Sequence, residues 1–166
     1  LKSDALDVIA DVFHVSVDDI VDIKVMKKGM TNRSFLFSCN GGDYIMRIPG
    51  EGTARLINRG QEAEVYQTIK GRGFCDDLIY MNPENGYKIT RYLQGVRTAD
   101  PYNITDLQRC MDKLRRFHDM NLKVGHEFDL FGQIEFYESL LNGQPSVFKD
   151  YQETKNKVLS LKPFIE

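Results

Sequence analysis

The sequence lacks the features that mark several large classes of protein. Its three cysteines are far apart and include no CxxC pair, so neither a disulfide framework nor a cysteine zinc site is indicated. Free thiols are typical of a reducing compartment, and we expect a cytoplasmic protein. No apolar run is long enough to cross a bilayer, so we expect no membrane span. The net charge of -2 argues against a nucleic-acid binder that works through bulk charge.

The two common phosphate-binding motifs are also missing. Gly50-Glu51-Gly52 lacks the third glycine of GxGxxG, and no GxxxxGK string occurs. The three histidines are scattered and form no Ser/His/Asp or Cys/His arrangement. His118, at the end of a helical segment, is better explained as a structural or capping residue. Any phosphate site in this chain must therefore use another arrangement.

What is present in the first half is the pattern of a small α+β lobe. Apolar residues at helical spacing predict helices over about residues 3–13 and 58–70. Alternating apolar residues predict strands at about residues 20–25, 34–39, 44–48, 78–81 and 87–92. The order of these elements predicts a five-stranded antiparallel sheet with the second helix packed on it.

The composition changes after Leu93, where residues 94–101 have the character of a linker. Three further helices are predicted at about residues 105–120, with Thr105 as cap, 133–141 and 151–161. We therefore divide the chain into a lobe of residues 1–93 and a hinge with a helical segment, residues 94–166.

A turn between the first two strands has the residues of a phosphate loop. In Gly29-Met30-Thr31-Asn32-Arg33-Ser34, backbone N–H groups and the hydroxyls of Thr31 and Ser34 can meet phosphate oxygens. An ordinary hairpin turn would use the same residue types, and the turn alone leaves both interpretations open.

Arg47 ends an apolar strand next to this turn. An isolated arginine on a strand is usually a solvated charge, but the forked guanidinium suits a phosphate and a carboxylate together. Glu62 and Glu64 on the following helix point to different faces, so only one of them can pair with Arg47. Such a pair beside the turn would hold a cation at the phosphates.

Together, these residues resemble the protein-kinase-like small-molecule kinases, and most closely the LicA-type choline kinases. The strings that carry the resemblance are Gly-Met-Thr-Asn-Arg-Ser-Phe at 29–35, Arg-Ile-Pro-Gly-Glu-Gly-Thr at 47–53, Leu-Ile-Asn-Arg-Gly-Gln-Glu-Ala-Glu at 56–64, Ile-Thr-Arg-Tyr-Leu-Gln-Gly at 89–95 and Leu-Arg-Arg-Phe-His at 114–118. The loop alone is shared with aminoglycoside kinases, whereas Arg-Ile-Pro-Gly followed by Asn-Arg-x-x-Glu is more specific. The resemblance covers nearly the whole chain and implies a kinase N-lobe followed by the start of a helical C-lobe.

The resemblance also implies an activity and a set of site residues. The activity is phosphorylation of the choline hydroxyl by ATP with Mg²⁺. Residues 29–34 would cover the ATP phosphates, with Arg47 in place of the strand-three lysine and Glu62 as its partner. Backbone groups of Arg91, Tyr92 and Leu93 would hold the adenine.

The catalytic half of the family pattern does not occur in the chain. The family reads His-x-Asp-x-x-x-x-Asn followed by a metal-binding Asp, whereas here His118 precedes Asp119 directly and His126 precedes Glu127. By the resemblance, the catalytic base, the Mg²⁺ ligands and the choline pocket are expected after Glu166, and this chain alone is expected to be inactive.

One consequence and two alternatives follow. Uncovered apolar faces on the truncated C-lobe predict self-association or a covering partner; the residues concerned include Leu107, Met111 and Leu114. A non-catalytic nucleotide-binding or interaction module would use the same lobe. A kinase acting on another alcohol, such as ethanolamine or an aminoglycoside, would also fit these motifs.

Overall fold

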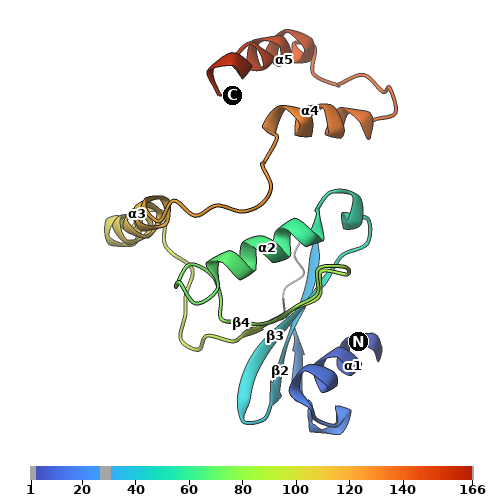
Figure 1. Ribbon diagram of the computed structural model, residues 1–166, viewed down its shortest axis with the longest axis vertical. Helices are drawn as coiled ribbons and strands as arrows, with labels where there is room; N and C mark the ends of the chain where they lie inside the picture. The colour runs from blue at the N-terminus through green and yellow to red at the C-terminus, as the bar shows by residue number, and fades with distance from the viewer. Residues whose placement is uncertain (1–2, 27–30, 166) are drawn as a thin grey trace. The chain divides into compact units, whose positions relative to one another are not determined.

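The structure is a computed structural model that describes residues 3–26 and 31–165. The chain forms two compact units, Leu1–Val124 and Gly125–Glu166 (Figure 1). The first unit contains the sheet and also helix α3 (Ile104–Asp119). The lobe boundary placed after Leu93 on composition stays a prediction.

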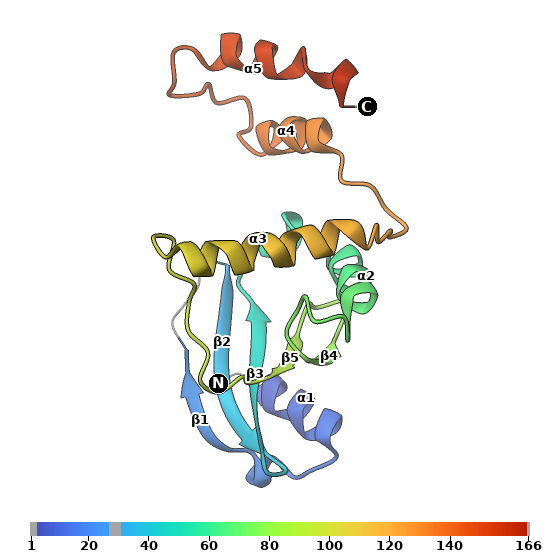
Figure 2. The ribbon, with the colours of Figure 1, turned by 90° about the vertical axis from the view of Figure 1, so that its left-hand side faces the viewer.

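The centre of the first unit is the predicted five-stranded antiparallel sheet (Figure 2). Its strands are β1 (Val21–Val25), β2 (Asn32–Cys39), β3 (Gly42–Pro49), β4 (Leu78–Met81) and β5 (Lys88–Arg91). They are hydrogen-bonded in the order β1-β2-β3-β5-β4. The β2–β3 hairpin closes through Asn40 and Gly41, which have φ angles of 50° and 72°. Positive φ at both central residues matches the twist of the strands, so the Asn-Gly pair determines this turn.

One face of the sheet packs on helix α1 (Ser3–Phe13) and carries the core. Because side chains alternate along a strand, every second residue of β2 and β3 faces this helix. The core consists of Ala5, Ile9, Ile20, Phe35, Phe37, Cys39, Tyr44, Met46 and Ile89. The edge strand β1 contributes little, since all five of its residues are exposed.

Helix α2 (Arg59–Ile69) follows β3 after a short 3₁₀ turn, Thr53–Arg55. Asn58 caps it, because the Asn58 Oδ1 atom accepts a hydrogen bond from the Gln61 N–H at 3.1 Å. The predicted helix of about residues 58–70 agrees with the observed helix and its two cap residues, Asn58 and Lys70.

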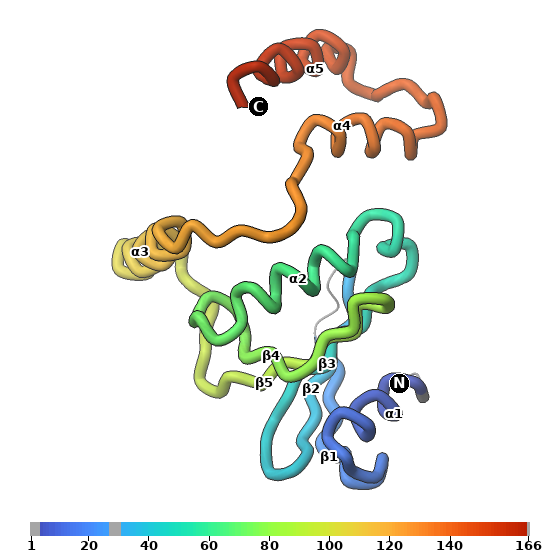
Figure 3. Tube along the Cα trace, in the orientation of Figure 1, coloured from blue at the N-terminus to red at the C-terminus, as the bar shows by residue number. Residues whose placement is uncertain are grey.

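An irregular segment leads from β5 to α3 (Figure 3). Asn103 caps this helix rather than Thr105, since its side chain accepts from the N–H groups of Thr105 and Asp106. The predicted cap was therefore two residues too late. Leu107, Met111 and Leu114, expected to belong to an uncovered apolar face, are 41%, 56% and 44% exposed.

The second unit contains helices α4 (Leu130–Ser139) and α5 (Tyr151–Leu159). Helix α4 starts three residues earlier than predicted because the Asp129 carboxylate accepts a hydrogen bond from the Gly132 N–H at 2.7 Å. Glu138 joins the two helices through Tyr151 and Lys155. No helix within the described residues is long and apolar enough to span a membrane.

Candidate functional site

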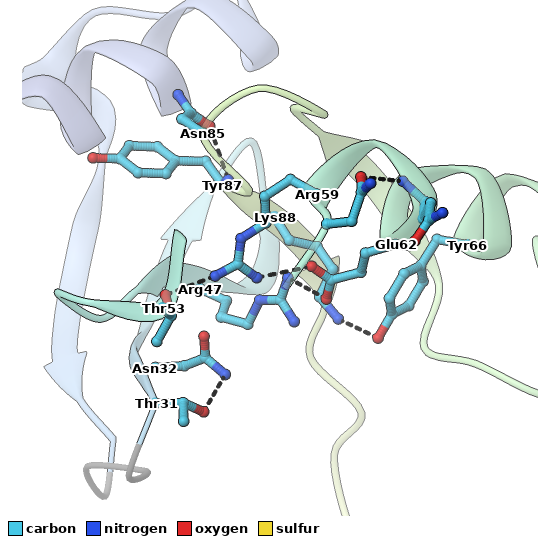
Figure 4. A network of polar contacts seen from close by, with 12 residues as sticks. Thr31, Asn32, Arg47, Thr53, Arg59, Glu62, Tyr66, Asn85, Tyr87 and Lys88 are labelled. Atoms are coloured by element: carbon cyan, nitrogen blue, oxygen red, sulfur yellow. Dashed lines mark hydrogen bonds and ion pairs between the residues drawn. The ribbon is translucent and has the colours of Figure 1, made fainter. Parts of the chain in front are cut away.

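Arg47 projects from the face of the sheet opposite to α1. Its neighbour on β3, Met46, faces the core, so alternation turns Arg47 to the other side. Lys88 on β5 is its register partner and therefore shares that side. Helix α2 covers this face, and its Glu62 Oε1 atom lies 2.8 Å from Arg47 Nη2 (Figure 4). The expected contact between the strand arginine and the helix carboxylate is present.

Glu62 is shared between two arginines. Its Oε2 atom accepts a hydrogen bond from Arg59 Nη1 at 3.0 Å, while Oε1 meets Arg47. Burial raises the pKa of the Glu62 carboxyl, but the guanidinium groups of Arg47 and Arg59 outweigh it and hold the pKa below its usual value. Glu64 is exposed. Of the two carboxylates left open by the sequence, Glu62 is the partner of Arg47.

Arg47 keeps donors that the described residues do not satisfy. Its Nε and Nη2 atoms are buried without a hydrogen-bond acceptor among residues 3–26 and 31–165. The Nη2 atom is close enough to Glu62 for an ion pair, but its N–H groups are not aligned on the carboxylate. Buried donors of a charged group need an acceptor, so this arrangement suits an anion.

Residues of the predicted phosphate loop lie beside these donors. Asn32 Nδ2 donates to Thr31 Oγ1 at 3.3 Å, and the Asn32 Oδ1 atom is buried without a partner in the described part of the chain. Ser34 is the register partner of Arg47 on β2, so its side chain shares the same face. Figure 4 shows Thr31 and Asn32 next to Arg47. The polar groups of strand β2 and the Arg47 guanidinium therefore converge.

The side chain of one predicted loop residue, Arg33, is not brought into this group. Gly29 and Met30 lie outside the described residues. Arg33 is exposed, and alternation along β2 turns it to the face opposite to Arg47. The Arg33 side chain therefore does not lie beside Arg47, and that the backbone of Arg33 meets phosphate stays a prediction.

Two buried cations near Arg47 were missed by the sequence analysis. Arg59 and Lys88 are 8% and 7% exposed. Lys88 Nζ donates to Tyr66 Oη at 2.6 Å and lies 4.0 Å from the Tyr66 ring centroid. The i,i+3 spacing of Arg59 and Glu62 on one helix could have indicated that Arg59 pairs with Glu62. The position of Lys88 beside Arg47 follows only from the strand register.

These residues form what we call the Glu62 cluster: Arg47, Arg59, Glu62 and Lys88. Two of the three cations, Arg47 and Arg59, share one carboxylate, and none of the four side chains is more than 19% exposed. No ion pair to Lys88 is found within the described residues. Such an excess of partly buried positive charge favours a ligand with several negative charges.

The predicted hinge residues begin at the last residue of strand β5. The N–H groups of Arg91 and Tyr92 donate to the carbonyls of Asp77 and Asp43, both at 2.9 Å. Leu93, which comes next, is 47% exposed. The N–H groups of Arg91 and Tyr92 are therefore used within the fold, and that backbone groups of this segment hold adenine stays a prediction.

The described residues contain no group of three or more His, Cys, Asp or Glu side chains that could hold a metal ion. They therefore do not fit a Mg²⁺ site. That the Mg²⁺ ligands follow Glu166 stays a prediction.

No protein-family model matches the chain. Among curated proteins it is similar to Protein LicA of Haemophilus influenzae, with 27% identity over 124 residues, which are 73% of this chain and 37% of the relative. A second Haemophilus influenzae LicA is 26% identical over 123 residues, 72% of this chain and 46% of the relative. The chain thus spans less than half the length of the curated relatives it matches.

Two solved structures give the same result. Choline kinase LicA from Streptococcus pneumoniae matches with a TM-score of 0.77 and 26% identity, over 98% of this chain and 57% of that chain. LicA in complex with AMP matches with a TM-score of 0.67 and 26% identity, over 88% of this chain and 50% of that chain. The chain thus has the fold of a kinase-like N-lobe with a helical part, and it resembles LicA-type choline kinases in both sequence and structure.

Proposed function

We propose that this chain is the nucleotide-binding part of an ATP-dependent small-molecule kinase, and that the phosphate acceptor is choline. Arg47, Asn32 and Thr31 would contact the ATP phosphates, and the N–H group of Leu93 would meet the adenine. The carboxylate of Glu62 would hold Arg47 in place. Phosphoryl transfer depends mainly on such positioning and on neutralisation of charge.

One observation carries this proposal. Arg47 is held by Glu62 through Nη2, while its Nε donor stays buried and without an acceptor in the described residues. A structural arginine would use its donors within the fold. The similar choline kinase and the LicA complex with AMP support a nucleotide as the anion and choline as the acceptor.

The same proposal makes the 166-residue chain inactive on its own. Transfer to an alcohol needs a base near the hydroxyl and a metal ion at the phosphates. The chain lacks the His-x-Asp-x-x-x-x-Asn segment, and its described residues lack a metal cluster. Residues after Glu166 would supply both.

The absence of a metal cluster among the described residues favours one alternative, a non-catalytic nucleotide-binding module. A coupled assay of ADP release with choline separates the two, run on this chain and on a version that continues past Glu166. We expect turnover only from the longer protein. Choline-dependent turnover by the short chain would contradict the need for later residues. Turnover by the longer protein with ethanolamine or an aminoglycoside, but not with choline, would keep the kinase and replace the acceptor.

We also propose that the short chain associates with itself through α3. Leu107, Met111 and Leu114 lie at helical spacing and are between 41% and 56% exposed. Replacing both Met111 and Leu114 by Lys should lower the sedimentation-equilibrium mass towards that of the 19.1 kDa monomer. Monomeric behaviour of the unchanged chain at the same concentration would contradict this proposal.

A further inference from the structure

Arg59 occupies a position that disfavours an arginine. It is the first residue of α2, where the helix dipole disfavours a positive charge, and it is 8% exposed. A buried charge is tolerated only where other groups satisfy it. Its contacts therefore indicate why an arginine is needed there.

The Arg59 guanidinium connects two elements. Nη1 donates to Glu62 Oε2 at 3.0 Å, and Nη2 donates to Thr53 Oγ1 at 2.8 Å (Figure 4). Thr53 is 5% exposed, and its hydroxyl donates in turn to the Gly50 carbonyl at 2.8 Å. Through Thr53, the carboxylate on α2 is attached to the end of β3.

This connection reaches the predicted phosphate loop. The Gly50 N–H donates to the Thr31 carbonyl at 2.7 Å, and Thr31 precedes Asn32. A closed circuit of contacts results, from Arg47 through Glu62, Arg59 and Thr53 back to Gly50 at the end of the same strand. Because Arg59 holds Oε2, the Oε1 atom of Glu62 is left facing Arg47.

We propose that Arg59 is a positioning residue that, together with Thr53, fixes Glu62 against Arg47 and so assembles the phosphate-binding face before nucleotide arrives. Arg59 acts through Glu62 and does not touch the nucleotide. The proposal has two steps. The first, that Arg59 fixes Glu62, stands without the proposed function; the second, that this strengthens nucleotide binding, rests on it.

The first step is tested by NMR titration of the Glu62 carboxyl in this chain without nucleotide. Arg59→Met removes a hydrogen bond that lowers the pKa of Glu62, so the pKa should rise; Thr53→Val should raise it less, and Arg59→Lys should restore part of the shift. Arg72→Met is the matched control, because Arg72 lies beyond the other end of α2 and its side chain donates to the Thr68 carbonyl. An unchanged Glu62 pKa in the folded Arg59→Met and Thr53→Val chains, or an equal change in Arg72→Met, would overturn the proposal.

The second step is tested by the affinity for ATP, measured by NMR shift titration. Arg59→Met should weaken binding about tenfold, the worth of one charge-assisted hydrogen bond. In a chain that already carries Glu62→Gln, Arg59→Met should weaken ATP binding by less than about twofold, because the carboxylate that Arg59 positions is gone. Equal losses in both backgrounds would show that Arg59 meets ATP directly and would overturn the positioning role. If no version binds ATP while the Glu62 pKa still responds to Arg59, the proposed function fails and the positioning of Glu62 stands.

Discussion

The Glu62 cluster and the α4–α5 pair both place a carboxylate between two elements, but they differ in charge balance. In the second unit, Glu138 meets one cation, Lys155, and one hydroxyl, that of Tyr151. In the first unit, Glu62 meets two arginines, and Lys88 lies on the same face without an ion pair in the described residues. A balanced group of this kind holds two helices together, whereas an unbalanced one attracts a ligand.

The Glu62 cluster and the α4–α5 pair also differ in burial and in the polarity of their surroundings. The cluster lies between a buried sheet and α2, with Arg47 15% exposed. The α4–α5 pair has an open apolar hollow beside it, lined by Ile134, Tyr137, Leu140, Leu141 and Val158. Buried charge with spare donors indicates binding, and exposed apolar side chains indicate a surface that another part of a protein covers.

The largest effect is expected from removing the central cation of the cluster. Arg47→Met should weaken ATP binding by roughly 30-fold to 100-fold, since charge-assisted contacts contribute about 2–3 kcal/mol. Lys155→Met removes the same kind of charge from the second unit and should leave the affinity unchanged. NMR shift titration measures both. An equal loss in the two variants would remove the distinction between the regions.

The next largest effect is expected on stability, from a substitution at Gly86 that disturbs the packing around Arg59. A methyl group at Gly86 would lie 2.7 Å from Arg59 Cδ, at a φ angle of 73°. Gly86→Ala should therefore lower the free energy of unfolding by about 2–3 kcal/mol, through backbone strain and displacement of Arg59. Gly71 has a φ angle of 72° and nothing within 4 Å, so Gly71→Ala should cost only about 1 kcal/mol. Urea unfolding compares them, and equal losses would contradict the close packing of Arg59.

A smaller and local effect is expected in the second unit. Hydrogen bonds from Lys155 and Tyr151 lower the pKa of Glu138, so its contribution to stability is present above the usual value of 4.5 and is lost as pH falls through the lowered value. Glu138→Gln should speed amide exchange in α4 and α5 at neutral pH, and the difference should vanish well below pH 4.5. Faster exchange in α2 as well would mean that the effect is not local.

The smallest effect concerns the segment before α3. Arg97 and the Asp100 N–H hydrogen-bond the Asp106 carboxylate and lower its pKa from 3.8 to about 2. Because the folded-state pKa is lowered, this contribution persists above 3.8 and is lost only as pH falls through about 2. NMR titration of Asp106 should show the low value, and Arg97→Met should raise it. A usual pKa in the unchanged chain would contradict these contacts.

Much of the first unit could be predicted from local patterns in the sequence. The alternation of apolar residues predicted all five strands, and the Asn40-Gly41 pair predicted the hairpin turn. The ion pair between Arg47 and Glu62 could also be predicted, because Arg47 ends a strand and Glu62 follows on the next helix. The cap of α3 was misplaced, since Asn103 and Thr105 are both good capping residues and only the backbone geometry separates them.

The sequence by itself determined the elements, their order and the residue types available for phosphate contact, because these depend on neighbours along the chain. Only the tertiary structure decided that Lys88 lies beside Arg47, that Glu62 rather than Glu64 faces it, and that Arg33 does not. It also decided that Asp77 and Asp43 occupy the N–H groups of Arg91 and Tyr92. Strand register and the rotation of a helix on a sheet are set by contacts between distant residues, and no local pattern encodes them.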